Sequence, residues 1–116
     1  MAYSTEILDR ALQRNREENE NRRQKTLTNV FQTLEKLSGF ISFQNAYIFG
    51  SLVKPFMFGK FSDIDLGFYG LRDEDFFKVM SFISSETGLE TDILQMQGHR
   101  LEQKIIKEGV QWKRKN

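Results

Sequence analysis

The 116-residue chain has no cysteine and a single histidine, His99. Without cysteine, disulfide bonds and zinc sites built from thiolates are excluded. A single histidine also excludes a metal centre that needs several imidazole ligands. These absences are typical of a protein of the reducing cytoplasm, where we expect this chain to function.

Strong net charge and long apolar runs are also missing. The 17 Lys and Arg side chains nearly balance the 16 Asp and Glu, for a net charge of +1, so we expect no direct nucleic-acid binding by the molecule as a whole. No stretch approaches the roughly 20 apolar residues of a membrane span, so we expect no membrane partner. The N-terminus has no apolar core of signal-peptide length. The length predicts one domain.

Residues 4–37 contain neither glycine nor proline and are predicted to be helical. Apolar residues recur at helical spacing near both ends of this segment, whereas residues 13–25 are wholly polar and are expected to be a solvated face. One long helix and two helices with a hinge fit this pattern equally. We expect the C-terminal part to dock on the core and the N-terminal part to project. Residues 1–37 are therefore interpreted as an N-terminal helical segment, and residues 38–116 as the domain proper, within one domain overall.

The rest of the chain alternates between short strand and helix patterns. Residues 46–49 form an apolar run and residues 63–68 alternate apolar with polar positions, which predicts two strands. Residues 73–87 have an amphipathic helical pattern, residues 89–96 alternate again, and residues 99–108 form a last short helix before a possible closing strand. This order predicts an α+β (α/β) fold with a small mixed β-sheet flanked by helices.

Three aspartates lie on the predicted strands that have a polar face. Asp63 and Asp65 are two residues apart, so their carboxylates point to the same side of one strand. Asp92 is on the next strand, and Glu90 on the same face is a possible third acid in its place. Converging carboxylates raise each other's pKa unless a cation lies between them, and Mg²⁺ prefers such oxygen ligands together with substrate phosphates. The pattern predicts a Mg²⁺ site, with two ions expected, that serves a phosphoryl-type displacement.

A Gly-Ser pair follows the first predicted strand. Gly50 allows the backbone to approach a ligand closely. Ser51 adds a hydroxyl group and, if a short helix starts there, backbone N–H groups directed at an anion. Lys54 lies about one turn further along and can reach a phosphate as a point charge. Beside the three aspartates, these residues predict a nucleoside triphosphate held by its phosphates next to metal ions.

The motif "GS…SDIDL" resembles the signature of the DNA polymerase beta-like nucleotidyltransferases. The short length is similar to that of the minimal nucleotidyltransferases (MNT), the antitoxin half of bacterial HEPN/MNT toxin–antitoxin modules. The resemblance covers Ala46 to about Trp112 and implies a minimal nucleotidyltransferase domain. It further implies that AMP passes from ATP, with Mg²⁺, to a hydroxyl group of a cognate HEPN ribonuclease toxin. The acceptor expected from the resemblance is a tyrosine, and its modification would block the RNase site.

The resemblance also assigns roles to single residues. The Gly-Ser pair would hold the triphosphate, with Ser62 of the motif as a further nucleotide contact. Asp63 and Asp65 would bind both metal ions, and Asp92 would bind the catalytic ion and help to deprotonate the acceptor. Two alternatives stay open: a small-molecule nucleotidyltransferase of the aminoglycoside-modifying type, and a non-catalytic antitoxin that inhibits by binding alone.

Two further segments are interpreted without reference to the motif. The large apolar side chains of residues 56–61 are expected to pack in the core, with an exposed partner-binding patch as the alternative. The basic residues 113–115 are expected to form a solvated tail.

Overall fold

The computed structural model describes residues 5–114. Strands and helices alternate along most of the chain after one long helix. The elements are α1 (Thr5–Leu37), β1 (Asn45–Phe49), the 3₁₀ helix η1 (Gly50–Val53), β2 (Ile64–Tyr69), the 3₁₀ helix η2 (Asp73–Asp75), α2 (Phe76–Thr87), β3 (Thr91–Gln95), α3 (Glu102–Glu108) and β4 (Val110–Lys113).

The four strands form one mixed sheet in the order β3-β2-β1-β4. β1 pairs with β2 and with β4 in antiparallel fashion, whereas β2 and β3 are parallel. Parallel neighbours need a crossover connection, and α2 supplies it between β2 and β3. The predicted α+β fold, with a small mixed sheet flanked by helices, is confirmed.

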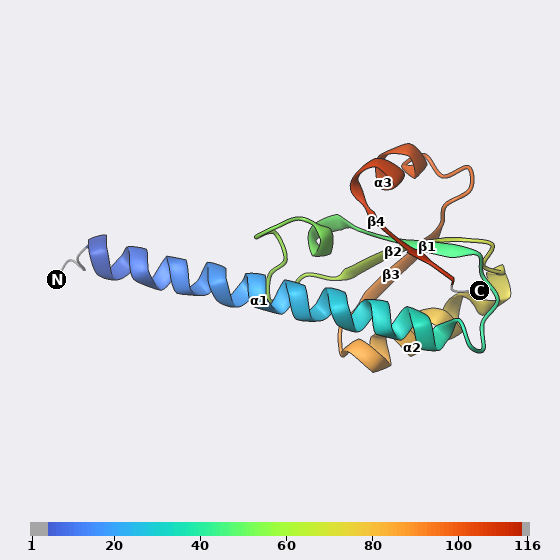
Figure 1. The fold of residues 1–116 in the computed structure, drawn as a ribbon, viewed down its shortest axis with the longest axis horizontal. Helices are drawn as coiled ribbons and strands as arrows, with labels where there is room; N and C mark the ends of the chain where they lie inside the picture. The colour runs from blue at the N-terminus through green and yellow to red at the C-terminus, as the bar shows by residue number, and fades with distance from the viewer. Residues whose placement is uncertain (1–4, 115–116) are drawn as a thin grey trace.

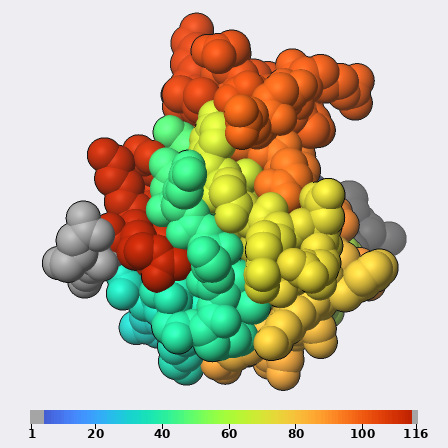
Figure 2. Space-filling view, turned by 90° about the vertical axis from the view of Figure 1, so that its right-hand side faces the viewer, coloured from blue at the N-terminus to red at the C-terminus, as the bar shows by residue number. Residues whose placement is uncertain are grey.

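Helices cover both faces of the sheet. α1 and α2 lie on one face (Figure 1), and α3 stands on the other, where Figure 2 shows it as a lobe above the rest of the domain. The core lies between the sheet and the α1–α2 layer, because a strand turns every second side chain to the same face. Its fully buried members include Val30, Leu34, Leu37, Ala46, Ile48, Ile64, Leu66, Phe68, Val79 and Ile83. The alternate positions of β2, Asp65 among them, therefore face the α3 side.

α1 is one continuous helix of 33 residues, so a single helix without a hinge is correct. Its C-terminal turns dock on the core, whereas every residue from 5 to 18 is exposed. The helix therefore projects from the domain, as expected, and gives the molecule extents of 59 × 28 × 25 Å (Figure 1). The predicted start of the helix, Ser4, lies outside the described residues. No helix within residues 5–114 is long and apolar enough to cross a membrane.

The loop between η1 and β2 departs from the expected core packing. Phe58 is buried, but Phe56, Met57 and Phe61 are 53%, 63% and 91% exposed. The Met57 N–H donates to the carbonyl oxygen of Lys54 at 3.1 Å, and the Ser62 N–H donates to that of Gly59 at 3.2 Å. The first tight turn presents Phe56 and Met57 to solvent, and the second presents Phe61. The core prediction is therefore wrong for three of these four side chains, and the alternative of an exposed apolar surface is correct for them.

The basic tail also departs from expectation at Arg114. Its guanidinium donates to the backbone carbonyl oxygens of Ser38, Ile41 and Phe43 at 2.7, 3.1 and 3.0 Å. A guanidinium has five N–H donors in a planar fork, so one side chain can serve three carbonyls of the α1–β1 connection. The solvated-tail prediction is wrong for Arg114, while Lys115 lies outside the described residues.

Candidate functional site

Two of the predicted acidic residues meet across the parallel strands. Asp65 on β2 and Asp92 on β3 are Cα partners in the ladder, and neighbouring strands are about 4.8 Å apart. Asp63 comes directly before β2. Asp65 is half-buried, whereas Asp63 and Asp92 are exposed. The fold thus brings the three predicted aspartates to one end of the β2–β3 pair.

The pKa of the Asp65 carboxyl group is raised above its ordinary value. Burial is the largest cause because it disfavours the charged form, and the negative charges of Asp92 and then Asp63 raise the pKa further. The other two aspartates therefore act on Asp65 through space, as converging carboxylates should. A cation bound among the three would relieve this repulsion.

The donor chemistry of this cluster suits a hard divalent cation such as Mg²⁺. Within residues 5–114, however, no group of three or more histidine, cysteine, aspartate or glutamate side chains is arranged to hold a metal ion. The structure has an opposed pair of carboxylates with a third nearby, and not a closed set of ligands. Because Asp63 and Asp92 are exposed, their side chains can turn toward Asp65 without any change in the core. The residues present therefore fit Mg²⁺ by chemistry and position, with a change of rotamer still required.

The strand register favours Asp92 over Glu90 as the third acid. Asp92 is the residue opposite Asp65. The backbone carbonyl oxygen of Glu90 instead accepts the Ile64 N–H at 2.9 Å, where the β2–β3 ladder begins. The exposed Glu90 therefore lies two residues before Asp92, beyond the Ile64–Thr91 pair, and so further from Asp65.

Gly50 forms the other wall of the acidic site. It follows β1 with a φ of +77°, a left-handed backbone conformation that favours glycine. A Cβ built on Gly50 would lie 2.4 Å from Oδ2 of Asp65. The sequence pattern predicts a close approach of the backbone to a ligand, and the structure adds that this backbone is already in close contact with a carboxylate.

Gly50 opens η1, so a short helix does begin at the Gly-Ser pair. Leu52 is fully buried and anchors η1 in the core. Ser51 is partly exposed and Lys54 is exposed, and the Lys54 N–H donates to the Ser51 carbonyl oxygen at 3.2 Å to close the turn. The Ser51 hydroxyl and the Lys54 ammonium group thus lie on the chain that leaves Gly50, available to an anion bound beside it.

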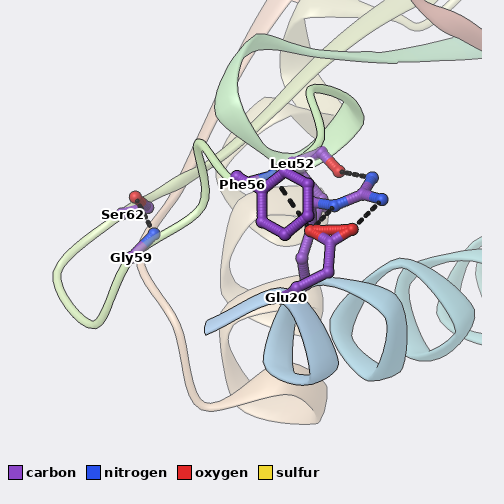
Figure 3. Close-up of polar contacts among 6 residues, drawn as sticks. Glu20, Leu52, Phe56, Gly59 and Ser62 are labelled. Carbon is purple, nitrogen blue, oxygen red and sulfur yellow. Dashed lines mark hydrogen bonds and ion pairs between the residues drawn. The ribbon is translucent and has the colours of Figure 1, made fainter. Parts of the chain in front are cut away.

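Ser62 shapes the loop that leads into Asp63. Its Oγ accepts the Gly59 N–H at 2.9 Å (Figure 3), and its own N–H donates to the Gly59 carbonyl oxygen at 3.2 Å. A hydroxyl group keeps one donor hydrogen after accepting a bond. Ser62 therefore holds the approach to the first aspartate and still has a hydrogen to donate.

A clamp between α1 and the η1 loop was not predicted. Glu20 accepts two bonds from the Arg23 guanidinium, both at 2.7 Å, and a third from the Phe56 N–H at 3.0 Å. Arg23 also donates to the Leu52 carbonyl oxygen at 3.2 Å (Figure 3). The guanidinium of Arg16 lies 4.5 Å from the centroid of the Phe56 ring, within the range of a cation–π interaction. These contacts fix the segment that follows Gly50 and Ser51 against α1.

The contacts of the clamp lower the pKa of Glu20. Its pKa is lowered to about 2, first by the hydrogen bond from Arg23 and then by the one from the Phe56 backbone. The prediction that residues 13–25 are a solvated face is therefore wrong at Glu20 and Arg23, whose side chains are only 15% and 12% exposed. The i,i+3 spacing of the pair was the only available signal, and such pairs are common on exposed helices.

Comparison with known proteins gives one family. The family model described as "Polymerase beta, Nucleotidyltransferase" matches residues 24–116, which include every residue of the acidic site and of the Gly-Ser turn. A search of curated proteins found no match.

Proposed function

The chain belongs to the polymerase beta nucleotidyltransferase family, and we propose that it is the antitoxin of a HEPN/MNT pair. In this proposal it transfers AMP from ATP to a hydroxyl group, expected to be a tyrosine, of a cognate HEPN-family ribonuclease toxin. Nucleotidyl transfer is the function of the family. The observation that supports catalysis in this chain is the register of Asp65 with Asp92, beside a glycine turn in contact with Asp65.

The proposed chemistry divides between the two walls of the site. The acceptor oxygen attacks the α-phosphorus of ATP, the bond from that phosphorus to the bridging oxygen breaks, and pyrophosphate leaves. The acceptor proton passes to the carboxylate of Asp92, which is exposed and so can be reached by a group on another protein. The phosphates are held on the side of the site away from Asp92, by Gly50, Ser51, Lys54 and Ser62.

Mg²⁺ would be held by Asp63, Asp65 and Asp92, and when bound it would neutralise charge on the phosphates and on the carboxylates. The raised pKa of Asp65 supports this, because the carboxylate is charged at a cost that a cation would offset. Rotation of the exposed Asp63 and Asp92 side chains toward Asp65 would complete the set of ligands.

Two surfaces support a protein partner. The exposed half of α1 has the apolar side chains Ile7, Leu8 and Leu12, each more than half exposed. The loop between η1 and β2 adds the exposed rings of Phe56 and Phe61. Neither surface is needed to assemble the acidic site. AMP on the partner would bring a negative phosphate and a bulky base to a site that must bind anionic RNA, and so would inhibit it by charge and by size.

The test is incubation of the chain with ATP, Mg²⁺ and the product of any adjacent gene for a HEPN-family protein, followed by mass spectrometry of that product. The proposal expects additions of AMP and loss of ribonuclease activity, and no addition with the Asp65→Asn variant. Inactivation without a mass change would instead support a non-catalytic antitoxin. An unmodified, active partner together with AMP transfer to a small alcohol would support the small-molecule enzyme.

A further inference from the structure

A small pocket lies between η1 and α3, on the α3 side of the sheet. Its cavity volume is about 220 Å³. Its walls are mainly apolar, formed by Phe49 and Val53 from the β1–η1 segment and by Leu101 and Ile105 from the α3 segment. None of the roles assigned above uses these side chains.

The pocket shares a wall with the acidic site. Gly50 lines the pocket, and the same glycine is in contact with Asp65, since its added Cβ would lie 2.4 Å from the Asp65 Oδ2. Only Gly50 therefore separates the acidic site from the pocket, so one ligand can extend from Asp65 into the pocket. The groove between α1 and Phe56, in contrast, is lined by Asp9, Leu12 and their neighbours and includes none of the three site aspartates.

The lining indicates which part of a nucleotide the pocket can take. Phosphates would lose water against four apolar side chains, so desolvation disfavours them inside the pocket, although Lys54 and Lys104 at its rim would attract an anion. A planar heterocycle suits apolar walls. Ligand pockets for drug-sized molecules start at roughly 300 Å³, so this smaller pocket has room for one ring system and not for a whole nucleotide.

The polar rim can recognise the edge of a base. Lys104 is exposed at the pocket and is an N–H donor, and Glu108 is an acceptor. The adenine edge offers ring nitrogens that accept and an exocyclic amino group that donates, which complements this lysine and this carboxylate. Lys54, on the Gly50 side of the pocket, stays with the phosphates.

We propose that the pocket between η1 and α3 binds the adenine base of the nucleotide and so sets the base preference of the enzyme. This assignment rests on the proposed function, because it needs the triphosphate to be bound at Gly50. It places the phosphates and the base on opposite sides of the same glycine.

The test fills the pocket from a position that tolerates a larger side chain. Leu101 is 36% exposed and directly precedes α3, so Leu101→Trp should place the indole in the pocket while the domain stays folded. Ile106→Trp is the matched control, since Ile106 is 40% exposed on α3 and does not line the pocket. Binding of ATP and of inorganic tripolyphosphate, both with Mg²⁺, is measured by calorimetry for the wild type and both variants.

Leu101→Trp should weaken ATP binding by about tenfold or more, the usual scale for loss of a stacked base, and leave tripolyphosphate affinity within about twofold of the wild type. Ile106→Trp should change neither. Glu108→Ala, at the exposed rim, should weaken ATP but not tripolyphosphate, which keeps the proposal testable if the indole prevents folding. Unchanged ATP affinity in a folded Leu101→Trp protein overturns the pocket assignment alone. Equal weakening of both ligands shows that the pocket holds phosphates and also overturns it. If the wild type binds neither ligand, the proposed function is wrong as well.

Discussion

Gly50→Ala is expected to destabilise the fold through Asp65, and its cost can be divided into two parts. The first part is the backbone: at a φ of +77° a residue with a Cβ costs about 1–2 kcal/mol. The second part is steric, because the new Cβ would lie 2.4 Å from the Asp65 Oδ2. The carboxylate is half-buried and can move, so the steric part is the cost of an off-rotamer side chain, about 0.5–1.5 kcal/mol. The total is about 1.5–3.5 kcal/mol.

Gly98→Ala separates the two parts. Gly98 has a φ of +76°, and a Cβ built on it meets nothing within 4 Å. It should therefore show the backbone cost alone, and Gly50→Ala should exceed it by the steric part. Urea unfolding at pH 7 measures both free energies of unfolding, provided that the m-values of the variants match that of the wild type.

The same measurement in an Asp65→Ala background completes the test. Without the carboxylate, the cost of Gly50→Ala should fall to that of Gly98→Ala. Equal costs for the two glycine variants in the wild-type background would refute the contact between Gly50 and Asp65. So would a Gly50→Ala cost that Asp65→Ala leaves unchanged.

Three further predictions concern ionisable groups. Asp65→Asn should raise the free energy of unfolding at pH 7 by up to about 1 kcal/mol, because the raised pKa of Asp65 means that its charged form is disfavoured in the fold. The gain should disappear below the ordinary pKa of 3.8, and added Mg²⁺ should raise the thermal midpoint of the wild type but not of this variant. Glu20→Gln should destabilise the protein above pH 4.5, and the difference from the wild type should vanish as the pH falls from 4.5 toward 2, since the lowered pKa stabilises the fold only while Glu20 is charged. Arg23→Ala, measured in the same urea series, should show the same pH window. Tyr69 donates to Glu102 at 2.5 Å and has a pKa raised to about 12. Tyr69→Phe should therefore lower the free energy of unfolding below pH 10 and match the wild type as the pH approaches 12. A constant difference across that range would contradict this reasoning.

Much of the fold follows from local pattern. The apolar run ending at Phe49 and the alternation from Ile64 to Phe68 predict β1 and β2, since burial on one or both faces imposes these patterns. The two-residue spacing of Asp63 and Asp65 likewise predicts their shared face. The position of Asp92 opposite Asp65 depends on the strand register, which the pattern of either strand alone does not determine.

Most of the features that the sequence did not predict depend on contacts between distant parts of the chain. Glu20 and Arg23 are typical residues of a solvated helix face. They form the clamp only because the fold brings Leu52 and Phe56 of the η1 loop beside them. Arg114 resembles a tail residue until the carbonyl oxygens of the α1–β1 connection are placed beside it. Phe56 is as apolar as a core residue but lies on a tight turn that presents its side chain to solvent. Tertiary contacts override the local preference at Glu20, Arg23 and Arg114, whereas a local turn does so at Phe56.

The projecting half of α1 owes its helicity to the half that is docked. The first turn of a helix is costly to form, and an isolated segment as short as residues 5–18 is marginal in water. Here the buried turns around Val30 and Leu34 supply the nucleus, and each residue toward the N-terminus is added by propagation alone. The amide hydrogens of α1 should therefore exchange with deuterium in a graded order, slowest near Val30 and fastest near Thr5. The length of the projecting helix is thus set by an equilibrium within the free protein, and any partner that bound Leu8 and Leu12 would extend it.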